Sequence, residues 1–198
     1  MASTAGGPAG PNPAKPLRAD AQRNRELVLR TAAGIFAAEG LSVPVHEIAR
    51  RAGVGTGTVS RHFPTKEDLF GAVLLDKMRQ LADFADTLAA EAGAGVAFVG
   101  LFGRVVRDGA AHRGLAEALA GAGFDVEAVA EQAGFGIASR LCTLLAQAQR
   151  EGAVRADVVY ADLKALLTGC LARAADQGAD DGGLDRVIAV VVAGLRPE

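Results

Sequence analysis

The sequence is poor in the residue types on which many functional sites and small compact folds depend. Its 198 residues include no tryptophan, one tyrosine, two cysteines and three histidines, and aromatic residues make up 5% of the chain. Because Cys142 and Cys170 are far apart, they do not indicate a disulfide framework, and a reducing cytoplasm is the expected environment. The low aromatic content also argues against recognition of single-stranded nucleic acid by base stacking.

Long apolar runs are missing as well. A membrane-spanning helix needs about 18 or more consecutive apolar residues, whereas the longest apolar stretches here are interrupted by Arg, Asp or Gly. Residues 1–17 are rich in Ala, Gly and Pro and lack the apolar segment of a secretory signal, so we predict a disordered tail there. We therefore expect a cytoplasmic protein without a membrane partner.

Charge of opposite sign is present in the two parts of the chain. The whole sequence has a net charge of −2, but the residues up to Lys66 carry nine Lys and Arg against four Asp and Glu, a net charge of +5, and the remainder carries −7. A basic segment joined to an acidic one is typical of a module that binds a polyanion, attached to a domain that does not. A solvated helix face would also be charged, so the asymmetry alone does not establish a partner.

Helix-forming residues dominate beyond the tail, and no sustained period-two alternation indicates strands. In the predicted first helix, residues 18–39, apolar side chains recur with helical spacing, and Gly40 is suited to end it. A long helix from residue 66 to about 90 would begin with a capping box formed by Thr65 and Asp68. Glycine-containing breaks then separate five further helices, so we predict an all-α fold of about nine helices.

Two short helices joined by a glycine turn are predicted between about residues 44 and 63, with Pro44 in the first turn of the first one. Gly53 ends the first of them, Thr56 caps the second, and the small residues Ala49 and Gly53 would let the two helices cross closely. With the preceding long helix they form a helix-turn-helix unit. We assign residues 18–65 to this three-helix unit and residues 66–198 to a helical bundle.

Polar and basic groups suited to duplex DNA lie on the second short helix and at Lys66, the first residue of the helix that follows. Arg61 can reach a guanine edge or a phosphate, small hydroxyl groups and an imidazole can meet phosphate oxygens, and Gly57 permits close approach. Lys66 adds positive charge at a helix N-terminus, which favours a phosphate. The same spacing also occurs in a structural helix–helix corner that has no role in DNA binding, and this alternative stays open at this point. The predicted DNA-binding residues are Thr56, Gly57, Thr58, Ser60, Arg61, His62 and Lys66.

Three motifs occur in order along this region: IFAAEG at residues 35–40, EIA at residues 47–49 and KEDLF at residues 66–70. Through them, residues 25–75 closely resemble the TetR family of bacterial transcriptional regulators. The resemblance implies that the helix over residues 56–62 is the recognition helix, with His62 on a phosphate and Lys66 clamping the backbone.

The sequence departs from the family pattern at two positions. Ser60 stands where the family usually has a tyrosine that bonds a phosphate, so the hydroxyl is kept but the reach and aromatic surface are lost. Pro44 stands where many members have Thr or Ser, and His46 or Ser42 could replace that phosphate contact. Both changes would weaken or redirect operator binding without removing the fold.

The resemblance also implies a body that dimerises and encloses an effector pocket. The dimer would form through helices at about residues 161–177 and 184–195, and the second of these is apolar around most of its circumference, so it must be covered. Burial within a single chain is the alternative explanation. Phenylalanines at helical spacing are more often plain core, but they are the candidates for an apolar ligand: Phe84, Phe98, Phe102, Phe124 and Phe135, together with Cys142.

Two further features of the body have structural interpretations. Gly134 and Gly136 interrupt a predicted helical run and would mark close packing, a kink or room for a ligand. Asp108 and His112 are read as a surface pair and not as metal ligands, because no second histidine is near. We predict no metal, no cofactor and no enzyme activity, since no nucleophile motif, phosphate-binding glycine loop or paired carboxylates stand out.

These observations predict a homodimeric, ligand-responsive DNA-binding regulator that acts as a repressor. It would bind a palindromic duplex operator and be released when a small, apolar effector favours another spacing of its two DNA-binding units. Two alternatives stay open. Ser60 and Pro44 are compatible with a helical ligand-binding or adaptor protein of weakened DNA affinity, and the apolar body with a small α-helical enzyme acting on an apolar substrate.

Overall fold

The computed structural model describes residues 14–175 and 182–197, and every regular element within these ranges is a helix, which confirms the all-α prediction. The helices are α1 (Ala14–Glu39), α2 (Val45–Arg51), α3 (Thr56–His62), α4 (Lys66–Ala92), α5 (Ala94–Ala111), α6 (Arg113–Gly121), α7 (Val126–Gln132), α8 (Ile137–Arg150), α9 (Tyr160–Ala175) and α10 (Gly183–Gly194). We refer to α1–α3 as the head and to α4–α10 as the body.

The first helix is longer than its sequence suggested. α1 begins at Ala14, inside the segment predicted as a disordered tail, and residues 1–13 of that segment lie outside the described ranges. Proline is tolerated in the first turn of a helix because its missing N–H needs no partner there, so Pro16 is compatible with this start. At the other end, Gly40 adopts a φ of +79° directly after α1, as expected for a residue that stops a helix.

The described ranges contain ten helices, one more than predicted, because the run expected across Gly134 and Gly136 is two helices. Gly134 has a φ of +82°, in the left-handed region that favours glycine, and follows Ala133, the C-cap of α7. Gly136 then precedes α8 as its N-cap. The two glycines therefore mark a helix boundary.

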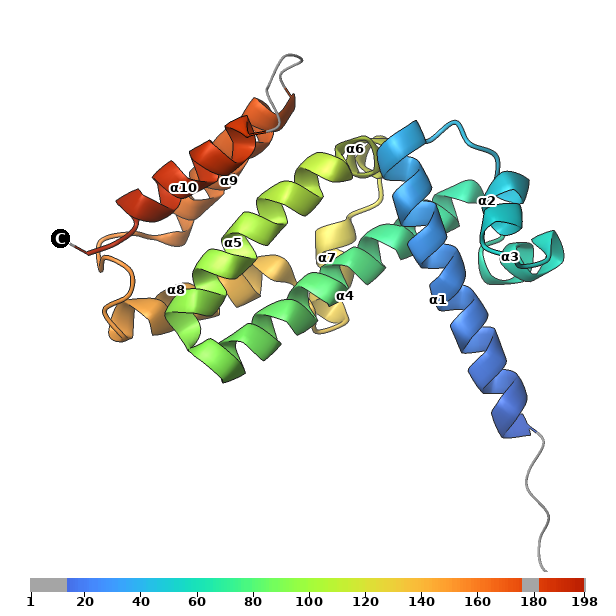
Figure 1. Cartoon of the computed structure of the whole chain (residues 1–198), viewed down its shortest axis with the longest axis horizontal. Coiled ribbons are helices and arrows are strands. Elements are labelled where there is room, and N and C mark those ends of the chain that lie inside the picture. Colours follow the sequence, from blue (N-terminus) through green and yellow to red (C-terminus); the bar gives the residue numbers. More distant parts are fainter. Residues whose placement is uncertain (1–13, 176–181, 198) are drawn as a thin grey trace, which may run out of the picture.

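The long helix α4 runs from the head into the body, where it packs against α5, α7 and α8 (Figure 1). α2 and α3 lie at one end, α9 and α10 lie together at the other, and α5 runs beside α4 through the middle. The predicted capping box is present at the start of α4. The Thr65 hydroxyl accepts the Asp68 N–H at 3.0 Å, and the Thr65 N–H donates to the Asp68 carboxylate at 3.0 Å.

The apolar core of the head includes residues of the body. Its buried members from α1–α3 pack against the first turns of α4 and against Leu115 and Leu119 of α6, which are 2% and 1% exposed. Burial of this kind stabilises the head through α6 as well as through its own helices. The head core comprises Val28, Leu29, Ala32, Ala33, Ile35, Phe36, Ile48, Ala49, Ala52, Val59, Phe63, Leu69, Phe70, Val73, Leu115 and Leu119.

The body has its own core on the inner face of α5. Phe98, Leu101 and Phe102 are completely buried there, between residues of α4, α8, α9 and α10. No helix in the described ranges is both long and apolar enough to cross a membrane. α4 contributes residues to both cores, so this helix links the position of the head to that of the body.

Candidate functional site

The turn between α2 and α3 depends on glycine for its backbone conformation. Gly53 has a φ of +67°, and a side chain at this position would meet nothing within 4 Å. The expectation that Gly53 is small because two helices cross closely is therefore wrong. Glycine is needed for the left-handed conformation, after which the Val54 N–H donates to the Ala49 carbonyl at 3.0 Å and closes the turn.

The start of α3 differs by one residue from the prediction. Gly55 is the N-cap, and its carbonyl accepts the Thr58 and Val59 N–H groups at 2.9 and 3.3 Å. Thr56 is the first helical residue and makes no capping hydrogen bond, so its predicted capping role is wrong. Its hydroxyl is consequently exposed on the surface of the helix.

α3 has one buried side chain and a polar outer face. Val59 is completely buried and Phe63, which follows the helix, is 4% exposed, so together they fix the helix against the head core. Arg61 forms no ion pair within the described part of the chain. A side chain built at Gly57 would meet nothing within 4 Å, so the surface there is open. The predicted residues Thr56, Gly57, Ser60, Arg61 and His62 are exposed, and Thr58 is half-buried.

Lys66 lies beside this face at the start of α4. It is half-buried, and its ammonium group lies 5.7 Å from the centroid of the Phe70 ring, so an aromatic face supports the cation. The guanidinium of Arg25 in α1 lies 5.6 Å from the centroid of the Phe63 ring. The structure thus brings a second cation to the same end of the head, one that the sequence reasoning did not select.

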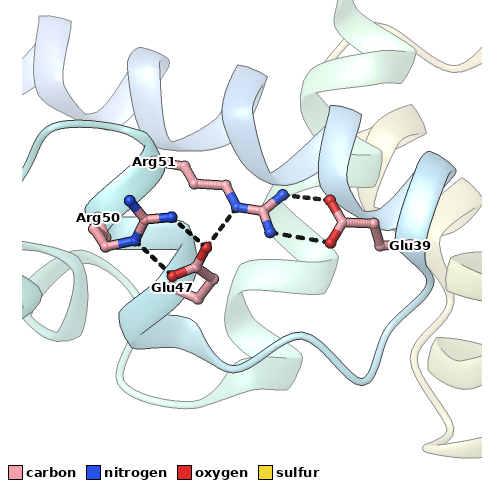
Figure 2. Close-up of polar contacts among 4 residues, drawn as sticks. All are labelled: Glu39, Glu47, Arg50 and Arg51. Atoms are coloured by element: carbon pink, nitrogen blue, oxygen red, sulfur yellow. Dashed lines mark hydrogen bonds and ion pairs between the residues drawn. The ribbon is translucent and has the colours of Figure 1, made fainter.

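Two other arginines of the head are held in an ion-pair network that sequence reasoning missed (Figure 2). Glu47 accepts hydrogen bonds from Arg50 Nε and Nη2 and from Arg51 Nε, each at 2.7 Å, and Arg51 also pairs with Glu39 at the end of α1. These bonds, from Arg50 first and then Arg51, lower the pKa of Glu47 from 4.5 to about 2. The spacing of Glu47 from the two arginines, three and four residues, was the signal available in the sequence.

A cavity of about 940 Å³ lies in the body among α4–α9. Its lining is mainly apolar and includes Met78 of α4, Leu141 of α8 and Phe124 from the segment between α6 and α7. Of the six residues predicted to contact a ligand, Phe124 alone lines this cavity. Phe124 also rests on α4, because a Cβ at Gly71 would lie 3.4 Å from the tip of its ring.

The other predicted ligand residues lie elsewhere. Phe135 lines, together with Phe124, a second cavity of about 510 Å³ between α1, α4 and the α6–α7 segment. Phe98 and Phe102 occupy the inner face of α5 and are completely buried in the body core, which explains why they reach neither cavity. Phe84 lies under the Arg104 guanidinium, 5.6 Å from its ring centroid, and Cys142 is exposed; neither lines the two cavities.

His112 is placed differently from its predicted surface position. It joins α5 to α6, is 8% exposed and lines the 940 Å³ cavity, and its Nδ1 has no hydrogen-bond partner among the residues that the structure describes. Burial, and next the positive charge of Lys77, lower the pKa of His112, so the neutral imidazole is favoured. Asp108 pairs instead with Arg104 at 3.1 Å. Within the described ranges, no three potential ligands cluster to hold a metal ion.

The two helices at the far end of the body expose small and apolar residues along one face each. Val190 of α10 is 71% exposed, the largest exposure of any large apolar side chain in the described ranges. Residues 176 and 177, the end of the predicted dimer helix, lie outside the described ranges. The exposed residues of this face are Ala161, Ala165, Gly169 and Ala172 of α9 and Ala189, Val190, Ala193 and Gly194 of α10.

A helix-turn-helix head, joined by one long helix to an α-helical body, defines the helix-turn-helix class of transcriptional regulators. Comparison with known families specifies the class further. Residues 28–73 match the description "Bacterial regulatory proteins, tetR family", and residues 93–197 match "Transcriptional regulator SbtR-like, C-terminal domain". The chain belongs to the TetR family, whose members are DNA-binding transcription factors and not enzymes.

Solved structures agree with this assignment over most of the chain. The TetR transcription regulatory protein from Mycobacterium vanbaalenii is 49% identical, with a TM-score of 0.74 over 91% of this chain and 99% of that protein. The TetR transcriptional regulator SCO0520 from Streptomyces coelicolor is 31% identical, with a TM-score of 0.74 over 87% of this chain and 98% of that one. Curated HTH-type regulators of Staphylococcus aureus are 39% identical over 54 residues, a match that spans 29% of their length.

Proposed function

We propose that the protein is a homodimeric repressor that binds a palindromic duplex operator through α3 of its two heads and is released by a small molecule bound in the body. The observation that carries the proposal is the outer face of α3. Hydroxyl groups, an imidazole and the unpaired Arg61 are exposed there on a helix anchored by Val59. A helix of this composition suits the major groove of duplex DNA.

The face formed by α9 and α10 supports the dimer. It lies at the opposite end of the molecule from α3, so a copy docked there would leave both heads free (Figure 1). Small residues let helices of two subunits approach closely, and the exposed Val190 would become buried. Two recognition helices could then contact half-sites separated by about one duplex turn, roughly 34–36 Å.

The proposal is tested by selecting bound sequences from a pool of random duplexes and measuring their affinity in a gel shift. We expect a palindromic sequence to be enriched and bound by a dimer. Val190→Glu should give a monomer of 20.2 kDa in light scattering and lose operator binding. Val96→Glu, which changes a 52% exposed valine at the start of α5, is the matched control and should remain dimeric.

A ligand-binding protein with weak DNA affinity is the second candidate, favoured by two departures in the head. Ser60 offers only a short hydroxyl on α3, and Pro44 is the N-cap of α2 without any side-chain capping bond. The same selection experiment separates the candidates. Binding of all duplexes with similar weak affinity would favour this second function and contradict the first. The predicted cytoplasmic location accompanies both proposals.

A further inference from the structure

We infer that the 940 Å³ cavity of the body binds a small organic acid, a molecule with an apolar body and one carboxylate group. The inference deepens the proposed function, since it rests on the cavity being the effector site. Three observations on the cavity lead to it. Within the described ranges, the walls are mainly apolar, the acidic side chains have partners whereas the lysines do not, and a buried histidine has an unused ring nitrogen.

The walls of the cavity suit an apolar body. Leu74, Met78 and Leu81 of α4 and Ile137 and Leu141 of α8 all line this space. Apolar side chains of this kind gain from covering an aliphatic or aromatic ligand and offer it no hydrogen bonds. A purely apolar ligand would, however, leave the polar groups of the cavity without partners.

The acidic side chains that line the cavity already have partners. Asp108 pairs with Arg104 at 3.1 Å, Asp125 accepts the Ala128 N–H at 2.9 Å as the N-cap of α7, and Glu127 accepts a backbone N–H of α8 at 3.1 Å. Each carboxylate is therefore used in holding the walls together. A cationic ligand would have to compete with these contacts.

The lysines that line the cavity lack such partners. Lys77 of α4 and Lys164 of α9 form no ion pair within the part of the chain that the structure describes. Two cations without counter-charges, on walls whose carboxylates are already engaged, favour an anionic group of a ligand by charge complementarity. None of the described residues that line the cavity is an arginine, so this lining does not offer the bidentate contact typical of phosphate recognition.

His112 supplies the third observation. Its side chain is 8% exposed, and its Nδ1 makes no hydrogen bond to any residue of 14–175 or 182–197, an unusual state for a buried polar group. A neutral imidazole carries one N–H donor and one acceptor, so it can donate to a carboxylate that is also paired with a lysine. Tyr160 adds a phenolic hydroxyl to the same lining. Single donors from several helices suit a carboxylate.

Titration calorimetry of the full chain with matched probes tests the inference. The acids are octanoate, dodecanoate and naphthylacetate, and each is compared with the alcohol, the amine and the phosphate ester of the same apolar body. We expect at least one acid to bind about tenfold or more tightly than its three counterparts. Tighter binding of the alcohol, amine or phosphate ester in every set overturns the inference, and so does the absence of binding by all acids at about 1 mM.

Variants of the lysines connect binding to the cavity. Lys77→Gln and Lys164→Gln should each weaken binding of the best acid by about tenfold and leave binding of its alcohol unchanged, whereas Lys77→Arg should keep the affinity for the acid. Arg150→Gln, which removes an exposed cation at the end of α8 outside the cavity, is the control and should bind the acid normally. Equal loss in all variants would contradict the inferred contacts.

A gel shift with the selected operator separates this inference from the proposed function. If an acid binds in calorimetry but does not release DNA, the ligand class stands and the effector role fails. If DNA is bound and is released only by an alcohol or an amine, the proposed function stands and the inferred ligand class is wrong.

Discussion

The head and the body of this protein differ in how their functional residues are distributed along the chain. The predicted DNA-binding residues of the head lie in one short helix, α3, with the addition of Lys66 at the start of α4. In the body, the cavity is lined by residues from Leu74 to Leu167, which α4–α9 bring together. A site carried by one helix can be read from a motif, whereas a site shared by six helices depends on how those helices pack.

The head is nevertheless not independent of the body. Leu115 and Leu119 of α6 complete the head core, while α6 also contributes to the lining of the 940 Å³ cavity through Ala116 and Ala120. One short helix thus touches the core under α3 and the candidate ligand site. The head and the body therefore differ most in the side chains they offer to a binding partner. They differ least in stability, because they share part of one core.

Leu119→Ala tests this shared core and should have the largest effect. The side chain is 1% exposed in the head core, so its truncation should lower the free energy of unfolding by about 2–5 kcal/mol. Hydrogen exchange should show the loss of protection in α2 and α3. Leu101→Ala, in the body core, is the comparison variant and should expose α5 first. Similar protection of α2 and α3 in both variants would show that the head is autonomous.

Arg61→Ala tests whether recognition is confined to the head. Loss of a contact to a base edge should weaken operator binding by about 1–3 kcal/mol, roughly 5- to 150-fold, without changing helix content or ligand affinity. Gel shift, circular dichroism and calorimetry measure the three quantities. Arg113→Ala, which removes an exposed cation at the start of α6, is the matched control. Unchanged operator affinity of the Arg61 variant would remove this residue from the interface.

Lys66→Ala examines the border between head and body. If the lysine contacts a phosphate, one fewer counterion is released on binding, and the slope of log K against log salt concentration should become shallower by about one. The sequence preference should stay the same, because a phosphate contact carries no base information. An unchanged slope would contradict the phosphate contact.

Glu47→Gln has the smallest expected effect and is specific to pH. The ion pairs hold the pKa of Glu47 near 2 in the folded protein instead of 4.5, so they stabilise the fold at pH values above 4.5. This contribution should disappear as the pH falls through about 2. Denaturant unfolding at several pH values should show the wild type losing its advantage over the variant in that window. A difference that does not depend on pH would contradict the assigned role.

The sequence predicted the parts of the structure that depend on neighbouring residues. The glycine that ends α1 and the capping box at Thr65 were both expected and are confirmed. These features follow from backbone conformation and helical spacing over a few positions. The placement of Thr56 after the cap differs by one residue, a typical error at a helix end.

The residues that line the cavity could not be predicted in the same way. Phe98 and Phe102 have the same spacing whether they face a ligand or a core, and only the packing of α5 against α8–α10 decides for the core. His112 and Lys77 gave no local signal, because only the folded chain buries His112 between α5 and α6 and brings it into one cavity lining with Lys77. Which residues reach the cavity is decided by contacts between helices that are distant in the sequence, and local spacing carries no information on such contacts.

The network of Glu39, Glu47, Arg50 and Arg51 has a consequence for the search of a genome. Both arginines are balanced by carboxylates of the same head, so they add less to attraction toward arbitrary DNA than their number suggests. Weaker retention at random sites leaves a larger share of the protein free to reach its operator, since random sites outnumber it by about a million or more. Two charges that shape the head would in this way also raise its selectivity.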